Sequence, residues 1–258
     1  MRILFIGDIY GKPGRRAVRH FLPRLREEHH PDVVVANGEN MAGGAGITRD
    51  TAGEMFRLGV AVLTTGNHVW DAREAIEYIP TEPRILRPLN YPPGTPGKGW
   101  VEVDVGGETL TVINVQGRVF MRQLDDPFRG MDALLADLGP KTHILVDLHA
   151  EATGEKQALA AYLDGRVSAV VGTHTHVPTA DAHVLGGGTA YISDVGMVGP
   201  RDSIIGSDAE SVIARYLTQM YHRHEVAKGP IMFNAVLIDL EPSGRAAGIQ
   251  LVQDLLPA

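Results

Sequence analysis

The sequence contains no cysteine and no long hydrophobic run. Without cysteine there are no disulfide bonds, no thiolate catalysis, no structural cysteine–zinc site and no iron–sulfur cluster. The apolar stretches all fall short of the ~18 residues that a membrane helix requires. The first of them, Ile3–Ile6, is followed at once by Gly7 and Asp8, which is too early for a secretory signal. We therefore expect a cytoplasmic protein without a membrane partner.

Basic residues are also scarce, since 24 Lys and Arg stand against 31 Asp and Glu and give a formal net charge of −7. Long nucleic acids bind through many cationic contacts to phosphate, so no stable nucleic-acid complex is expected. A small anionic substrate is compatible with this charge if the site supplies its own cations. Hydrophobic residues at 44% and charged residues at 21% are typical of a globular chain. We expect one domain over residues 1–258 and a homo-oligomer.

Short apolar runs rich in β-branched residues recur along the chain and predict strands buried on both faces. They are Arg2–Ile6, Asp32–Ala36, Val60–Thr64, Thr109–Val115, His143–Leu148, Val167–Val171, His183–Ile192 and Ile231–Leu240. Amphipathic stretches between them predict helices. These are the segment that begins at Pro13, then Thr48–Leu58, Ala72–Tyr78, Arg129–Leu138 and Glu155–Leu163. Alternating strands and helices indicate a layered α/β fold.

Proline and glycine mark the breaks in this pattern. Pro23 is predicted to kink or end the first helix. Five prolines and three glycines within Pro83–Gly99 predict irregular surface chain. Trp100–Val105 and the strand that begins at Thr109 flank Gly106-Gly107, which is typical of a hairpin, and a second hairpin is expected to turn at residues 186–188.

Polar residues of metal-binding type follow five of the predicted strands. In open α/β sheets, ligands bind outside the carboxyl ends of the strands, so these junctions are expected to converge on one site. Oxygen and imidazole donors suit Fe, Mn, Zn, Ni or Co, and about seven ligands exceed the need of one ion. Two ions about 3.5–4 Å apart with a shared carboxylate would use them all. The junctions are Gly7-Asp8, Asn37-Gly38-Glu39-Asn40, Gly66-Asn67-His68, Asp147-Leu148-His149 and Gly172-Thr173-His174-Thr175-His176.

Each junction alone has an ordinary structural explanation. Asp8 suits a helix N-cap, Glu39-Asn40 a polar turn, and a single histidine a surface or core position. Two histidines one residue apart directly after a buried strand are seldom needed for packing, however, and all five junctions together favour a site. The segment Gly7–Pro13 is one residue short of a phosphate-binding P-loop, and its proline stands where that loop needs Ser or Thr.

The order GD, GEN, GNH, H and GTHTH resembles the calcineurin-like metallophosphoesterases. Residues 7–15, 37–40, 65–71 and 194–200 resemble more closely the bacterial YmdB-like branch, which comprises di-metal phosphodiesterases acting on 2′,3′-cyclic nucleotides. Tyr10 stands where the superfamily has a metal-binding histidine and Glu39 where it has the bridging aspartate, and both are features of this branch. The resemblance implies a four-layer α/β/β/α sandwich and an enzyme that hydrolyses small phosphodiesters such as 2′,3′-cAMP.

The resemblance also implies residue roles. One metal ion would be held by Asp8, Glu39, Asn40 and His176, and the other by Glu39, Asn67, His149 and His174, with Glu39 as the bridge. Iron is favoured, with Mn, Zn or Mg as alternatives. A hydroxide activated by the two ions would attack phosphorus while His68, left free of metal, protonates the leaving ribose oxygen.

Further candidates rest on residue type alone. Asp71 could orient His68, Trp70 or Tyr10 could stack on a base, and Arg118 and Arg201 could contact phosphate. Two other functions stay open at this point. One is a phosphatase or nuclease with broader substrates, and the other is a metal-bound regulatory protein that binds without catalysis. Retention of His68 beside a full ligand set favours the enzyme, because binding alone needs no acid.

Overall fold

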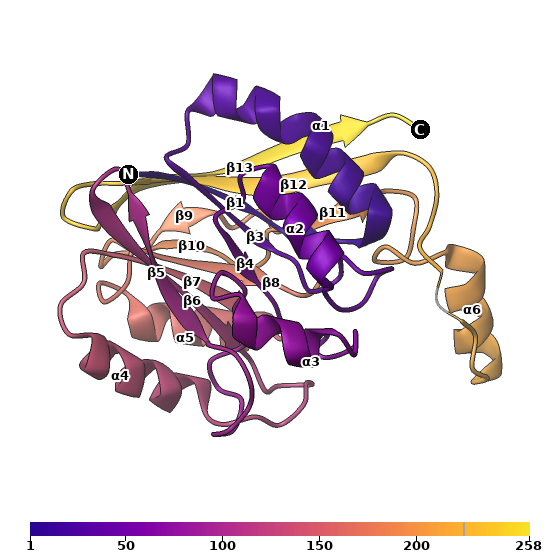
Figure 1. Ribbon diagram of the computed structural model, residues 1–258, viewed down its shortest axis with the longest axis horizontal. Helices are drawn as coiled ribbons and strands as arrows, with labels where there is room; N and C mark the ends of the chain where they lie inside the picture. The colour runs from indigo at the N-terminus through magenta and orange to yellow at the C-terminus, as the bar shows by residue number, and fades with distance from the viewer. Residues whose placement is uncertain (224) are drawn as a thin grey trace.

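The computed structural model describes residues 1–223 and 225–258, and its core is two β-sheets stacked face to face (Figure 1). The first sheet has the order β2 (Asp8–Ile9), β11 (Met197–Pro200), β12 (Ile231–Leu240), β1 (Arg2–Ile6), β3 (Val33–Asn37) and β4 (Val62–Thr64), and β13 (Ala246–Leu256) also pairs with β12. The second has the order β5 (Trp100–Val105), β6 (Glu108–Gln116), β7 (His143–His149), β8 (Ala169–Thr173), β10 (Ala190–Ile192) and β9 (His183–Val184).

Helices cover the outer face of each sheet. Residues of α1 (Gly11–His29) and α2 (Arg49–Arg57) share a hydrophobic cluster with the first sheet, and residues of α4 (Pro127–Leu138) and α5 (Thr153–Leu163) share another with the second. The short α3 (Ala75–Tyr78) runs into a 3₁₀ turn at Ile79–Thr81. The layers therefore follow the order α/β/β/α, which confirms the predicted fold. That residues 1–258 form one domain stays a prediction.

Strand β1 shows why its sequence is apolar throughout. Ile3 and Phe5 belong to the cluster between the two sheets, whereas Leu4 and Ile6 belong to the cluster beneath α1 and α2. Side chains of a strand alternate between its faces, so a strand covered on both sides needs apolar residues at every position. Strand β7 repeats the pattern in the second sheet, with Leu145 between the sheets and Val146 beneath the helices.

Parallel pairing brings the carboxyl ends of the strands together. In the first sheet β1 pairs in parallel with β3, and β3 with β4, where Asn37 lies opposite Thr64. In the second sheet β7 runs parallel to β6 and β8, where His149 lies opposite Thr173. The loops that follow these strands consequently emerge side by side along one edge of the sandwich.

Helix α1 differs from the prediction, because it continues through Pro23 to His29. Pro23 has no N–H, so the carbonyl of Arg19 loses its helical hydrogen bond. Both residues lie on the exposed side of the helix, where water can replace that bond. Buried Phe21, Leu22 and Leu25 hold the helix against the sheet around this point. Of the two predicted effects of Pro23, ending the helix was therefore wrong, and a kink stays a prediction.

Other boundaries shift by a few residues, and β2, β11, β13 and α6 (Ala209–Thr218) were not predicted at all. Both predicted hairpins form, since β5 pairs antiparallel with β6, and β9 with β10.

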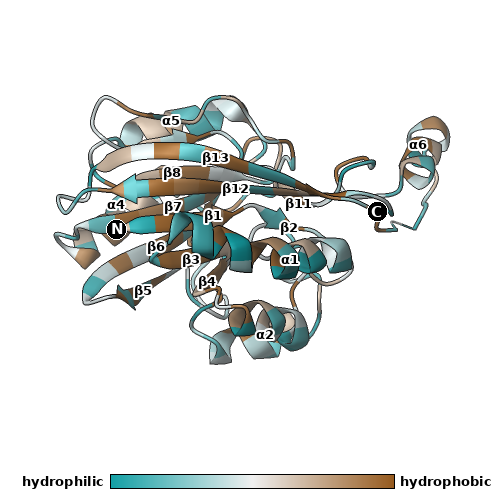
Figure 2. Cartoon of the chain, turned by 90° about the horizontal axis from the view of Figure 1, so that it is seen from above, coloured by the Kyte–Doolittle hydropathy of each residue, from teal (hydrophilic) through white to brown (hydrophobic). Residues whose placement is uncertain are grey.

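Helix α6 stands away from the layered body (Figure 2). It and the residues after it expose apolar side chains at Ile213, Tyr216, Leu217, Met220 and Tyr221. Within residues 1–223 and 225–258, none of the helices is long and apolar enough to cross a membrane.

Candidate metal centre

The seven predicted ligand side chains meet at the edge where the parallel strands end. Asp8 lies in β2, and His149 is the last residue of β7. Glu39 and Asn40 occupy the turn after β3, Asn67 the loop after β4, and His174 and His176 the loop after β8. Both sheets therefore contribute to one cluster.

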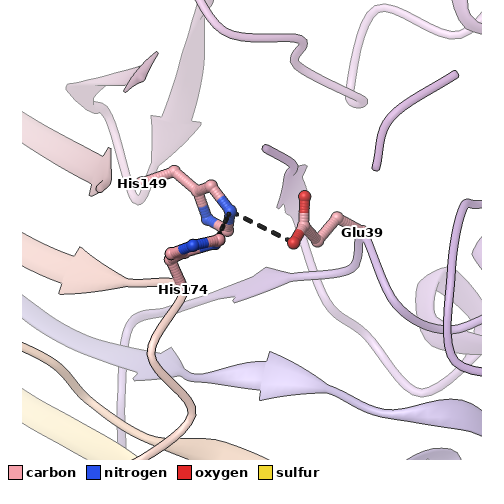
Figure 3. A group of neighbouring side chains, drawn as sticks. All are labelled: Glu39, His149 and His174. Carbon is pink, nitrogen blue, oxygen red and sulfur yellow. Dashed lines mark hydrogen bonds and ion pairs between the residues drawn. The ribbon is translucent and has the colours of Figure 1, made fainter. Parts of the chain in front are cut away.

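Glu39, His149 and His174 form the centre of this cluster, with one potential ligand atom from each lying within 4.8 Å of the others (Figure 3). His149 Nε2 lies 3.1 Å from Glu39 Oε1 and 3.0 Å from His174 Nδ1. It is also 3.0 Å from Asn67 Oδ1. Four potential ligands from four different loops or strands thus point to a common position.

Asp8, Asn40 and His176 form an adjoining group. His176 Nε2 lies 3.1 Å from Asn40 Nδ2 and 3.9 Å from Asp8 Oδ1. Asn40 Nδ2 also donates to Glu39 Oε1 at 3.2 Å, so the two groups are contiguous through Glu39. All four side chains are at least nine-tenths buried.

Two oxygen atoms in this cluster indicate that it is built to hold cations. Asp8 Oδ1 and Asn40 Oδ1 are buried, and neither has a hydrogen-bond partner within the described part of the chain. A buried polar atom without a partner is costly, whereas a metal ion would satisfy both oxygens. The donors are carboxylate, amide and imidazole groups without sulfur, a set that divalent Fe, Mn or Zn accepts. These residues therefore fit a divalent metal site.

The protonation states of the cluster respond to burial and to one another. Burial raises the pKa of Asp8 to about 6. Burial also opposes ionisation of Glu39, but the neighbouring His149 outweighs it and lowers the Glu39 pKa to about 2. Conversely, Glu39 overcomes the effect of burial on His149 and raises its pKa to about 9, while burial and His149 lower the pKa of His174 to about 3. A proton on His149 thus offsets the charge of Glu39, and a bound cation would take its place.

A buried chain of hydrogen bonds fixes the ring of His149. Its Nδ1 lies 2.9 Å from Thr173 Oγ1, and that hydroxyl donates to Asp147 Oδ1 at 2.7 Å. The other oxygen of Asp147 accepts hydrogen bonds from Thr64 and, at 3.0 Å, from Asn37 Nδ2. These hydrogen bonds leave Nε2 of His149 available to a metal ion, which is how metal-binding histidines are commonly oriented. Sequence reasoning missed this support, although a charged residue inside the apolar run His143–Leu148 was a usable signal.

His174 and His176 lie on a strained turn that a buried ion pair holds in place. Their φ angles are 103° and 67°, a region that non-glycine residues seldom adopt. Asp194 accepts the N–H of Thr175 between them at 3.0 Å and pairs with Lys156 Nζ at 2.8 Å. His176 Nδ1 also donates to the carbonyl of residue 205 at 2.8 Å, which leaves Nε2 facing the cluster. Neither Lys156 nor the carbonyl was identified from the sequence.

His68 lies beside the cluster and contacts it through its backbone. Its Nδ1 lies 2.7 Å from Asp71 Oδ2, and its backbone N–H donates to Glu39 Oε2 at 3.0 Å. The side chain is 40% exposed, so a substrate can reach it. Nδ1 is held by Asp71, so Nε2 is the nitrogen left to exchange a proton.

The other residues suggested as substrate contacts bond to or pack against other parts of the protein. The hydroxyl of Tyr10 bonds to that of Ser207 at 2.9 Å, and the ring packs edge-on against His176. Trp70 is half-buried and packs against the cluster beneath α1 and α2. Arg118 pairs with Asp126 at 2.9 Å, and Arg201 pairs with its neighbour at 2.7 Å.

Comparison with known proteins places this geometry in a family. The sequence model described as YmdB-like protein matches residues 4–252. The 2′,3′-cyclic-nucleotide 2′-phosphodiesterase of Bacillus subtilis is 48% identical over 248 residues, which cover 96% of this chain and 94% of that protein. A crystal structure of a hypothetical protein from Thermus thermophilus has a TM-score of 0.95 and 48% identity, and each chain is fully covered. A phosphatase structure from Mycoplasma pneumoniae has a TM-score of 0.94 and 29% identity, covering 99% of this chain and 93% of that one. This chain belongs to the YmdB-like protein family.

Proposed function

We propose that this protein is a metal-dependent phosphodiesterase that hydrolyses 2′,3′-cyclic nucleotides. The observation that carries the proposal is a cluster of seven oxygen and imidazole donors with the acid–base pair His68–Asp71 directly beside it. The relative from Bacillus subtilis, which covers nearly the whole chain, has the activity named 2′,3′-cyclic-nucleotide 2′-phosphodiesterase. We extend both the substrate class and the cleaved 2′ ester to this chain.

The cluster would hold two ions. Asp8, Glu39, Asn40 and His176 would bind one, and Glu39, Asn67, His149 and His174 the other, with the Glu39 carboxylate shared between them. The contiguity of the two groups through Glu39 supports this division. Iron is our first choice and Mn, Zn or Mg are alternatives, since the donors are hard or borderline. Bound ions of this kind acidify water and offset negative charge on phosphoryl oxygens.

The side chains around the cluster supply the rest of the chemistry. In the reaction the oxygen of water bonds to phosphorus, the bond from phosphorus to the 2′ oxygen breaks, and the 2′ oxygen must gain a proton. His68 Nε2 gives that proton, and Asp71 orients the ring through its contact with Nδ1. The backbone contact from His68 to Glu39 sets the distance between the acid and the cluster.

The test is a comparison of kcat/KM for 2′,3′-cAMP, 3′,5′-cAMP and p-nitrophenyl phosphate at one metal loading. We expect the first to be hydrolysed fastest, because opening its five-membered ring relieves strain, and we expect 3′-AMP as its product. His68→Ala is the matched control, since it keeps every proposed ligand.

Other results point to other functions. Preference for the monoester, or for single-stranded RNA at physiological salt, favours a broader phosphatase or nuclease. Binding of 2′,3′-cAMP without turnover by the metal-loaded protein favours a regulatory binding protein.

A homo-oligomer is also part of this proposal. The apolar side chains that α6 and the following residues expose would be covered in it, since burying apolar surface is favourable. Light scattering of the unaltered protein and of Leu217→Glu tests this. We expect an oligomer that the substitution weakens, and a protein that is monomeric in both forms contradicts the proposal.

The net charge of −7 continues to argue against a stable nucleic-acid complex.

A further inference from the structure

A pocket of about 390 Å³ opens directly beside the metal centre. One wall consists of Asn67, His68 and His174, which are two proposed ligands and the proposed acid. The loop after β6 also lines the pocket, through Phe120, Met121 and Arg122. A molecule whose phosphate lies at the metal centre therefore meets this loop with whatever it carries on its other side.

Phe120 is the unusual residue of the loop, because its side chain is 89% exposed. Its φ angle of 61° is in the left-handed region, which bulky residues rarely adopt. An apolar ring normally gains free energy by leaving water, so a strained backbone that presents the ring to solvent calls for an explanation. Strain of this kind is commonly kept where a residue has to contact a ligand.

The loop that carries Phe120 is fixed at its base. Gly117 N–H donates to the carbonyl of His149 at 3.0 Å, so the loop starts beside a proposed ligand. The carboxylate of Glu155 accepts the N–H groups of Arg118 at 2.9 Å and Val119 at 3.1 Å. Arg118 in turn pairs with Asp126. The ring of Phe120 is therefore held out on an anchored support.

We propose that Phe120 stacks against the base of the bound cyclic nucleotide and so makes the enzyme select nucleotides over other cyclic phosphates. This inference rests on the proposed function and names the recognition element of that site. Stacking suits an exposed ring, because every base has an aromatic face. Among the described residues that line this pocket, Phe120 is the only aromatic one apart from the histidines. Tyr10 and Trp70, the other suggested stacking residues, pack elsewhere.

The experiment compares two substrates that differ only in the base. For Phe120→Ala, we expect KM for 2′,3′-cAMP to rise roughly 5- to 150-fold, the range of stacking energies for one base. The turnover number should change little, because the ring lies away from the reacting phosphate. With methyl riboside 2′,3′-cyclic phosphate, which has no base, the variant and the unaltered protein should show equal KM values.

Two further variants separate stacking from disturbance of the loop. Phe120→Trp keeps an aromatic face and should keep a low KM for 2′,3′-cAMP. Val119→Ala removes a neighbouring exposed side chain and should behave like the unaltered protein with both substrates. Metal content and thermal midpoint are measured for every variant.

Each outcome decides the matter. If the unaltered protein hydrolyses 2′,3′-cAMP and Phe120→Ala leaves its KM unchanged, or raises KM equally for the substrate without a base, stacking is refuted while the proposed function stands. If the unaltered protein hydrolyses no cyclic nucleotide, the proposed function fails and this inference fails with it.

Discussion

Removal of one buried charge should show how strongly the ion pair beneath the candidate metal centre stabilises the fold. Lys156 and Asp194 are each 1% exposed, and their charged atoms lie 2.8 Å apart. In Lys156→Met the side chain keeps an unbranched apolar stem but ends one atom earlier, without the ammonium group. Asp194 then remains buried as an ion whose partners are the N–H groups of Thr175 and Gly196, at 3.0 and 2.9 Å.

Breaking a buried pair on one side costs about 3–5 kcal/mol in the free energy of unfolding. Because two backbone donors still stabilise the carboxylate, we expect the lower end, about 3 kcal/mol. Adding Asp194→Asn removes the unpaired charge, so the double variant should lose less stability than the two single variants summed. The coupling energy should be about 1.5 kcal/mol or more.

Urea unfolding measures these values, with a chelator present so that metal binding does not add to stability. Lys141→Met is the matched control. Its ammonium lies 2.7 Å from Glu102, but the two side chains are 30% and 37% exposed, so the loss should stay within about 1 kcal/mol. If Lys156→Met costs no more than this control, burial does not make the pair important and the reasoning is wrong.

Three further predictions concern the centre itself. His68→Ala should retain its metal content while kcat falls about 10²- to 10⁴-fold, and metal loss would instead make His68 a ligand. Glu39→Ala should lower the occupancy of both ions in metal analysis, whereas loss of one ion alone would argue against a bridge. Gly66→Ala places a new carbon 2.1 Å from Cδ2 of His149 and should reduce metal content, while Gly154→Ala, which meets nothing within 4 Å, should not.

The convergence of the polar residues could be predicted from the sequence because their positions follow a simple rule. Parallel strands of one sheet end at a common edge, so polar residues after β3 and β4 were expected to lie near one another, as were those after β7 and β8. The stacking of the two sheets then brings both groups together. The candidate ligands could therefore be named without knowledge of the side-chain contacts. Their individual roles stay predictions.

Features that depend on packing between distant segments were not accessible. Lys156 lies in an amphipathic helix and could not be distinguished from an ordinary surface lysine until the helix packed over Asp194. Pro23 was expected to kink or end the first helix. That it lies on the exposed side depends on the orientation of the whole of α1, which the sequence did not show. Phe120 gave no signal either, since a phenylalanine in a loop is normally buried.

The position of β12 has a consequence for how the protein folds during its synthesis. This strand lies between β11 and β1, although it is synthesised more than 220 residues after β1. Its Asn234 accepts the N–H of Gly7 at 3.1 Å and donates to the carbonyl of Met197 at 2.7 Å, so it fixes the backbone beside Asp8. On the ribosome, the edges of β1 and β11 therefore stay open until residue 240 has emerged, and they are exposed to aggregation during that time. The backbone on both sides of the proposed ligand Asp8 is accordingly fixed only after residue 240 has emerged.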